Sequence, residues 1–276
     1  MPKFEILCVT MHQNDFSKLS EMNIHSNVVF ANQSNITNYE EFHFDGNIAK
    51  MITTNTRGVG INRNLSLMYA SGDICLLSDD DMCYVDNLEE IVCREFEENS
   101  KADVIIFNVE TDKNCVRPQI KYTKTRKVRK FERMPWGGVR IAFRLSSVRK
   151  ANVFFTTLFG GGAIFASGED SLFLKDLKKA GLNFYVSKKN IGRVSFETSS
   201  WYSGRDEKLF YSRGAYIQQL HPRLFFIFSL YYAFRLGKNS KLKFFNRIKW
   251  MNNGRSGFMN LLSYNIFVDR NKNDAR

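Results

Sequence analysis

The stretch GDICLLSDDDM at residues 72–82 constrains the fold of this chain more than any other segment. Residues 74–77 have the continuous apolar character of a short buried strand, and three aspartates, Asp79, Asp80 and Asp81, follow where that strand should leave its sheet. Adjacent carboxylates repel one another, so the stretch is costly unless solvent or a cation compensates the charge. The sequence predicts a strand that ends in an acidic turn or in a cation site.

Strand patterns alternate with helical patterns over the first part of the chain. We expect strands at 4–10, 28–30, 48–52, 74–77 and 104–107, a helix after the glycine turn at 58–60, and another over 86–99 with Asp86 as its N-cap. This alternation is typical of an α/β fold with a Rossmann-like, mostly parallel sheet. Ligands of such sheets bind beyond the carboxyl ends of the strands, where the aspartates, Thr10 and Asn32 are expected.

The second half of the chain has a less regular pattern. A helix is expected to open at Gly168-Glu169-Asp170 and to end at Gly181, and a strand follows at 184–186. From about residue 206 the pattern predicts amphipathic helices. We therefore expect a domain over residues 1–205, with halves at 1–110 and 111–205, and a basic, aromatic helical extension over 206–276.

The formal net charge of +12 is the most informative bulk property. It indicates an anionic partner, which is a nucleic acid, an anionic membrane surface or a phosphorylated small molecule. Seven lysines and arginines lie within 121–133, where they either hold an acceptor lipid diphosphate or form a solvated loop, and 223–255 is basic and aromatic together. The apolar run 224–234 is shorter than the roughly 20 residues that a membrane span requires, so no transmembrane segment is expected.

Three groups of polar residues are candidates for chemistry. Asp79 and Asp81 are two residues apart, and side chains at that spacing in a strand point to the same side. Their carboxylate oxygens suit Mg²⁺ or Mn²⁺, and the alternative is a solvated turn. Arg63 lies early in a helix after a glycine turn, where anions bind, although a surface arginine would show the same pattern. Glu169 and Asp170 at a helix start are either capping residues or a positioned general base, and a glycosidase pair is also conceivable.

Three segments together resemble the family 2 glycosyltransferases of GT-A fold, and bacterial members that build capsular or other surface polysaccharides in particular. They are ILCVT in the first strand, RGVGINRNLSLMYASGDICLLSDDDM, and FGGGAIFASGEDSLFL. The resemblance covers residues 4–200. It implies a GT-A fold, a Rossmann-like mixed, mostly parallel sheet flanked by helices, whereas the C-terminal helical extension is expected from the residue pattern alone.

The resemblance also implies a role for each candidate residue. Arg63 would help to hold the nucleotide, Asp79 would contact its ribose or base, and Asp81 would bind the Mn²⁺ or Mg²⁺ that bridges the diphosphate. Asp170 would be the base for the acceptor hydroxyl, and Glu169 would position the acceptor. Thr10 and Asn32 would flank the nucleotide base. The chain departs from the family at Asn32-Gln33, where many relatives are acidic, and at 197–201, where many have a histidine.

The expected function is an inverting, metal-dependent glycosyltransferase in bacterial surface polysaccharide synthesis. Its donor would be a UDP- or dTDP-sugar, its acceptor a saccharide carried on a lipid, and its place the inner, cytoplasmic face of the cell membrane, as a peripheral protein. Two alternatives are a nucleotide-sugar hydrolase or nucleotidyltransferase with the same acidic site, and a basic nucleic-acid-binding protein. Against the latter, no recognised nucleic-acid module is visible, so no nucleic-acid partner is expected.

Overall fold

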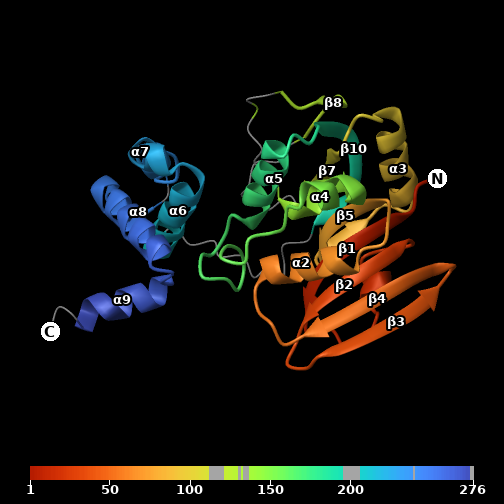
Figure 1. Cartoon of the computed structure of the whole chain (residues 1–276), viewed down its shortest axis with the longest axis horizontal. Coiled ribbons are helices and arrows are strands. Elements are labelled where there is room, and N and C mark those ends of the chain that lie inside the picture. Colours follow the sequence, from red (N-terminus) through yellow and green to blue (C-terminus); the bar gives the residue numbers. More distant parts are fainter. Residues whose placement is uncertain (112–120, 130–131, 133–136, 195–205, 239, 274–276) are drawn as a thin grey trace. The chain divides into compact units, whose positions relative to one another are not determined.

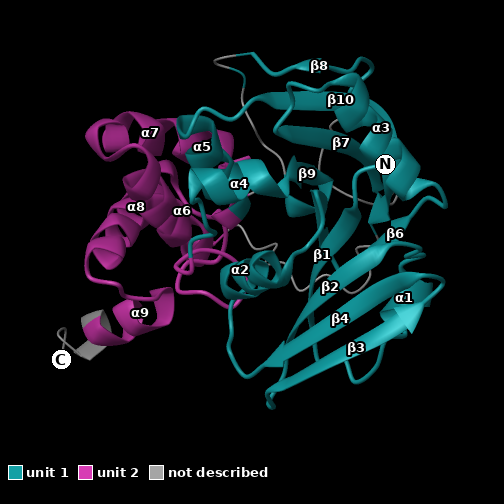
Figure 2. Cartoon of the chain, turned by 45° about the vertical axis from the view of Figure 1, so that its right-hand side comes forward, with its two compact units in different colours: residues 1–156, 170–199 teal, residues 157–169, 200–276 magenta. Residues whose placement is uncertain are grey.

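A computed structural model describes residues 1–111, 121–129, 132, 137–194, 206–238 and 240–273. The chain forms two compact units (Figure 2), of which the first comprises residues 1–156 and 170–199 and the second residues 157–169 and 200–276. The expected domain boundary at residue 205 lies outside the described residues. The expected assignment of 157–169 to the first domain differs from this division, which groups that segment with the C-terminal helices.

The first unit is built on one mixed sheet (Figure 1), whose described strands follow the order β3-β4-β2-β1-β5-β9-β7-β10-β6, with β8 beside β10. The pairs around β1, namely β4-β2, β2-β1 and β1-β5, are parallel, and so is β7-β10. The strands are β1 (Phe4–Met11), β2 (Asn27–Gln33), β3 (Asn38–Phe44), β4 (Asn47–Thr54), β5 (Ile74–Asp79), β6 (Met82–Tyr84), β7 (Val104–Thr111), β8 (Arg126–Lys127), β9 (Ile141–Arg144) and β10 (Phe184–Val194).

Helices cover both faces of this sheet. The alternation of side chains along β1 shows the two cores, because Ile6 packs in one of them with Phe96 and Leu7 packs in the other with Leu67. A parallel sheet with both faces covered buries its strands on each side, which explains their continuous apolar character. The helices are α1 (Lys18–Glu21), α2 (Val59–Tyr69), α3 (Leu88–Glu98), α4 (Leu145–Ala151) and α5 (Glu169–Lys179), with a 3₁₀ turn at Gly138–Arg140.

The predicted α/β class with a mostly parallel sheet is confirmed. The strands β6, β8 and β9 and the helices α1 and α4 were not predicted, and two further points differ. The edge strand β3 was not predicted, and the helix expected from Asp86 begins at Leu88 with Asn87 at its N-cap. The Asp86 carboxylate instead accepts a hydrogen bond of 2.8 Å from the Asn23 side chain, so it holds a neighbouring loop rather than the helix end.

The second unit is helical, as the pattern from residue 206 predicted. Its helices are α6 (Glu207–Leu220), α7 (Phe225–Arg235), α8 (Phe244–Met259) and α9 (Tyr264–Asn273), with a 3₁₀ turn at Pro222–Leu224. Helices α6 and α8 pack closely, since a Cβ at Gly214 would overlap the Met251 carbonyl and one at Gly254 would overlap that of Tyr211. Across the described residues, no helix has the length and apolar character that crossing a membrane requires.

Candidate active site

The carboxyl ends of the central strands bring the predicted polar residues to one edge of the sheet. In the parallel register of β1 with β2, Thr10 lies opposite Asn32, and in that of β1 with β5, Val9 lies opposite Asp79. Asp80 follows directly, and its Oδ2 accepts a hydrogen bond of 2.5 Å from Thr10 Oγ1. The edge that the strand pattern predicted therefore exists and gathers these side chains.

Asn32 is a buried residue that makes hydrogen bonds to other residues at this edge. The side chain is fully buried, and its amide nitrogen donates to Gln13 O at 2.9 Å and to Thr53 Oγ1 at 3.0 Å. Its Oδ1 accepts from Gln13 N at 3.1 Å. Asn32 thus fixes the loop after β1 through the Gln13 backbone. Its predicted position beside a nucleotide base stays a prediction.

Arg63 lies at the centre of the site. Its side chain is 1% exposed, so the alternative of a surface arginine is wrong. Its Nη2 lies 3.0 Å from Asp79 Oδ1 and 3.4 Å from Asp170 Oδ1, and its guanidinium carbon lies 5.5 Å from the centre of the Phe155 ring. One buried cation therefore contacts a carboxylate at the end of β5 and another at the start of α5.

Asp170 is held from a second side by Gly138. The Gly138 backbone N–H donates to Asp170 Oδ2 at 2.7 Å, while Oδ1 faces Arg63. Asp170 is mostly buried, and a Cβ on Gly138 would lie 2.6 Å from the Arg63 Cζ and closer still to both Nη atoms. Only a glycine leaves room here for both contacts. The Asp170 carboxylate is accordingly fixed in orientation.

Electrostatics at the end of β5 are unfavourable without a cation. Burial raises the pKa of Asp79, Arg63 opposes that effect, and Asp170 and Asp80 add to it. Burial, followed by the charges of Asp79 and Asp80, raises the pKa of Asp81 to about 7. Asp81 Oδ1 is buried and makes no hydrogen bond within the described part of the chain. A buried oxygen of this kind fits a divalent cation, and Asp79 and Asp81 are the residues that would hold it.

Within the described residues, Asp79 and Asp81 are not joined by a third metal-binding side chain. Among the described residues, no group of three or more histidine, cysteine, aspartate or glutamate side chains is arranged to hold a metal ion. Mg²⁺ and Mn²⁺ bound with a nucleotide take one or two protein carboxylates and complete their shell with phosphate oxygens and water. Residues 197–201, which contain no histidine, lie outside the described residues.

Glu169 is the first residue of α5 and is 1% exposed. Its Oε2 accepts a hydrogen bond of 3.0 Å from Gly168 N, in the segment that packs with the C-terminal helices. Phe159 and Phe165 anchor that segment, both fully buried and in ring contact with Phe258. Glu169 is therefore a buried residue at a fixed helix start, and its predicted role toward the acceptor stays a prediction.

Two asparagines beside Arg63 had no predicted function. Asn62 Nδ2 donates to Ala31 O at 2.9 Å and to Thr10 O at 3.3 Å, which ties α2 to the ends of β2 and β1. Asn64 pairs with the Phe155 backbone, donating to its oxygen at 2.9 Å and accepting from its nitrogen at 2.7 Å. The sequence INRN carried a signal for these contacts, since asparagine is uncommon inside helices unless its amide bonds to a backbone.

The basic stretch 121–133 is only partly described, because Lys130 and Arg133 lie outside the described residues. Arg126 in β8 makes two hydrogen bonds of 2.8 Å to the carboxylate of Glu132. One of the cations expected to bind an acceptor diphosphate is therefore paired with a carboxylate of the same stretch. The two interpretations of this stretch stay predictions.

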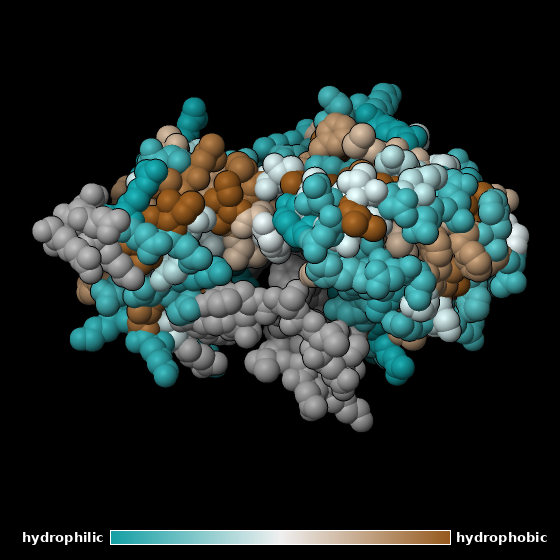
Figure 3. Space-filling view, turned by 90° about the horizontal axis from the view of Figure 1, so that it is seen from below, coloured by the Kyte–Doolittle hydropathy of each residue, from teal (hydrophilic) through white to brown (hydrophobic). Residues whose placement is uncertain are grey.

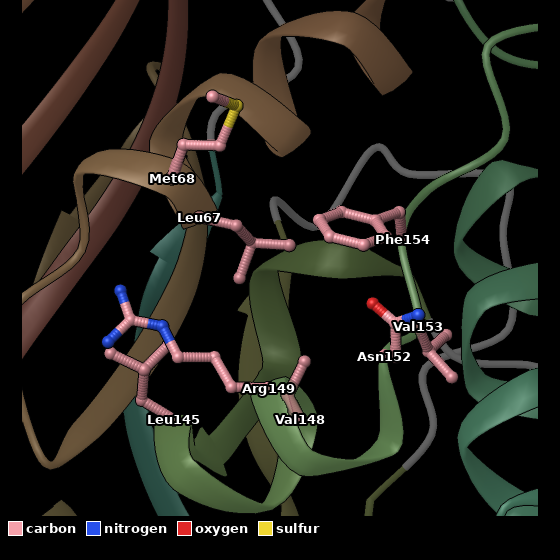
Figure 4. Close-up of a pocket in the computed structure, with 8 residues that line it drawn as sticks. All are labelled: Leu67, Met68, Leu145, Val148, Arg149, Asn152, Val153 and Phe154. Atoms are coloured by element: carbon pink, nitrogen blue, oxygen red, sulfur yellow. The ribbon is translucent and has the colours of Figure 1, made fainter.

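A separate pocket of about 290 Å³ lies between the end of α2 and α4. Figure 4 shows Leu67, Val148 and Phe154 around it. Its lining contains none of the predicted site residues, and Phe154 immediately precedes the ring that packs against Arg63. The pocket therefore borders the site without forming part of it.

Comparison with known proteins agrees with this architecture. Residues 33–153 match the sequence model of glycosyl transferase family 2. No curated protein sequence matches the chain. Among solved structures, S. aureus TarS 1–349 in complex with UDP-GlcNAc aligns with a TM-score of 0.56 and 15% identity over 94% of this chain and 72% of that one.

The complex of the same S. aureus fragment with UDP gives a TM-score of 0.54 and 15% identity, and it covers 94% of this chain and 71% of that one. The longer S. aureus TarS chain gives 0.53 and 15%, and 43% of its length is covered, against 94% of this chain. Identity this low shows the fold alone. The expected GT-A fold is thereby confirmed.

Proposed function

Because residues 33–153 match the sequence model of glycosyl transferase family 2, we propose that the chain is an inverting, metal-dependent glycosyltransferase acting from a nucleotide diphosphate sugar. One observation carries the proposal. A single buried guanidinium, that of Arg63, contacts Asp79 at the nucleotide edge of the sheet and Asp170 at the start of α5. One group thus holds the two carboxylates that we assign to the donor and to the acceptor.

The donor would lie beyond the carboxyl ends of β1, β2 and β5, as ligands of open α/β sheets do. Asp79 would contact its ribose or base, and Thr10 would line the same edge through its bond to Asp80. The TarS structures of similar fold hold UDP-GlcNAc or UDP, which favours a uridine diphosphate sugar, and a dTDP-sugar is the second candidate. Arg63 is buried behind this edge, so it would act on the donor mainly by orienting Asp79.

Asp170 would be the general base. The acceptor hydroxyl oxygen forms a bond to the anomeric carbon as the bond from that carbon to the diphosphate oxygen breaks, and the hydroxyl proton passes to Asp170. The nucleoside diphosphate leaves with the electron pair, and the configuration at the anomeric carbon inverts. Gly138 N and Arg63 Nη2 hold the two oxygens of this carboxylate, which orients it for the transfer.

Asp81 and Asp79 would hold Mn²⁺ or Mg²⁺. When bound, the cation would neutralise the charge that develops on the departing diphosphate. The buried Oδ1 of Asp81 supports this assignment because it makes no hydrogen bond among the described residues. Glu169 would help to position the acceptor.

The acceptor is proposed to be a saccharide carried on a lipid, in the synthesis of a bacterial surface polysaccharide. The enzyme would then act as a peripheral protein at the inner face of the membrane. The basic and aromatic composition of 223–255 supports this part of the proposal.

Calorimetric titration of UDP, and separately of dTDP, with Mn²⁺ and then with chelator tests the donor and metal assignments together. We expect metal-dependent binding in the native protein and its loss in Asp81→Asn, with an unchanged circular dichroism spectrum. Binding that is unaffected by chelator would contradict the metal assignment. Rapid donor turnover without any acceptor would favour the hydrolase alternative.

A further inference from the structure

Helix α7 exposes a continuous apolar face. Its residues Phe225, Ser229 and Ala233 are buried against the rest of the second unit, whereas large side chains on the other side are exposed. Phe226 is 61% exposed and Phe234 is 82% exposed. The exposed set comprises Leu224, Phe226, Ile227, Leu230, Tyr231 and Phe234, and we call it the α7 face.

This face is not a scatter of single apolar residues, which every protein surface contains. Its members recur at helical spacing over three turns, and Phe245 at the start of α8 is 80% exposed as well. Figure 3 shows exposed hydrophobic residues on both the left and the right parts of the molecule, so the α7 face is defined by the exposed fractions of its residues. Contiguous apolar surface of this kind marks a contact with a membrane or a partner.

Charge identifies the partner. Residues 208–268 contain ten lysines and arginines and no aspartate or glutamate. Some of these cations serve the fold, such as Arg247, which donates to Leu242 O at 2.8 Å and to Ala233 O at 3.1 Å. Others flank the α7 face as exposed side chains, namely Arg223, Arg235, Lys238, Lys241 and Lys243.

A second copy of this chain does not fit the α7 face. A symmetric contact would place two such acid-free basic segments against each other, and like charges without counter-charge repel. An anionic bilayer satisfies both properties, because its acyl region accepts the apolar side chains and its headgroups attract the flanking cations.

We propose that the α7 face inserts into the interface of an anionic membrane, with α7 parallel to the bilayer plane. The helix has 11 residues, too few to span a bilayer but enough for about 16 Å of contact at 1.5 Å per residue. The cations at both ends then lie at headgroup depth. This inference rests on the proposed function only in linking membrane binding to a lipid-linked acceptor. The α7 face itself does not depend on which reaction the active site performs.

Vesicle sedimentation with the full chain tests the proposal. We expect binding to vesicles of phosphatidylglycerol and phosphatidylcholine, weak binding to phosphatidylcholine alone, and a decrease as salt is added. The double variant Phe226→Ser/Phe234→Ser should bind anionic vesicles at least tenfold more weakly. The matched control is Ile36→Ser, which removes a 60% exposed apolar side chain from the first unit and should bind as the native protein does.

Insertion is measured separately from charge attraction. In Phe234→Trp the added fluorescence should shift to shorter wavelength with anionic vesicles, and in Ile36→Trp it should not. An unshifted signal from the Phe234→Trp variant, or native vesicle binding by the double serine variant, would overturn the proposal, as would concentration-dependent dimerisation that the double serine variant abolishes. Titration of UDP without vesicles reports on the active site alone, so failure of the nucleotide site and failure of the membrane face are distinguishable.

Discussion

The guanidinium of Arg63 lies against the backbone of Gly138, so closely that a side chain at position 138 would overlap it. The same glycine donates its N–H to Asp170. The pair thus sets the position of the cation and of the proposed base at once, which makes the glycine a positioning residue of the site.

Gly138→Ala should lower the rate of transfer by about tenfold to a hundredfold, because a displacement of the order of 1 Å at the reacting groups has that effect. Gly137→Ala is the matched control, since a Cβ at Gly137 would meet no atom of the described residues within 4 Å, chain neighbours aside. Initial rates with donor and acceptor, compared between the two variants, check the prediction. Equal rates would show that Arg63 adapts without consequence.

Arg63→Ala should lower the free energy of unfolding by about 3 kcal/mol, because it leaves the carboxylates of Asp79 and Asp170 without their buried cation. Arg94 is also paired to two carboxylates but is 66% exposed, so Arg94→Ala should cost less than about 1 kcal/mol. Urea denaturation of both variants gives the comparison. Similar losses in the two would mean that the buried network contributes no more than a surface pair.

Asp170→Asn should lose transfer by about a hundredfold to ten-thousandfold, the range expected for removal of a general base. Donor binding should be retained, since the amide oxygen can still accept from Gly138 N. Asp176→Asn, on the exposed side of the same helix, serves as control. Transfer at the native rate in Asp170→Asn would assign the base to another residue.

The ion pair of Arg126 and Glu132 predicts a pH dependence of stability. The hydrogen bonds from Arg126, with the Arg129 backbone, lower the pKa of Glu132 to about 2 against opposition from burial. A carboxyl whose folded pKa is depressed stabilises the fold above its unfolded pKa, and that contribution is lost as pH falls from the usual value near 4.5 toward 2.

Glu132→Gln should therefore lower the free energy of unfolding at pH 7 by up to about 1 kcal/mol, with the difference shrinking below the usual pKa of glutamate. Arg126 is 40% exposed, so the effect should also weaken with salt. Denaturant titrations of both proteins across acidic pH measure it. A difference that grows on acidification would contradict the assigned pair.

Much of the sheet could be predicted because its strands are buried on both faces and show as apolar runs. Strand β3 lacks that signal, since nearly all of it is exposed at the sheet edge. The sequence signal for its hairpin is Asp45-Gly46, the Asp-Gly dipeptide typical of tight β-turns, and both residues have positive φ. Attention to that dipeptide would have found the strand.

The candidate residues could be predicted from their residue types. The hydrogen bonds and ion pairs among them could not be predicted from the sequence. Gly138 and Asp170 are 32 positions apart, and no local pattern indicates that one donates to the other. Burial of Arg63 was likewise invisible, because an arginine early in a helix has the same spacing whether it faces solvent or two carboxylates. Such contacts depend on how distant segments pack.

Three consecutive residues of α2 contact three different parts of the first unit. Asn62 holds the ends of β1 and β2, Arg63 holds the two carboxylates, and Asn64 holds the backbone at Phe155. This helical turn therefore links the three parts, and a shift of α2 would move the carboxyl-terminal edge of the sheet, the proposed base and the wall of the neighbouring pocket together. A ligand that moved this helix would change donor affinity and proton transfer in one step, and by linkage the donor would change the affinity for that ligand equally.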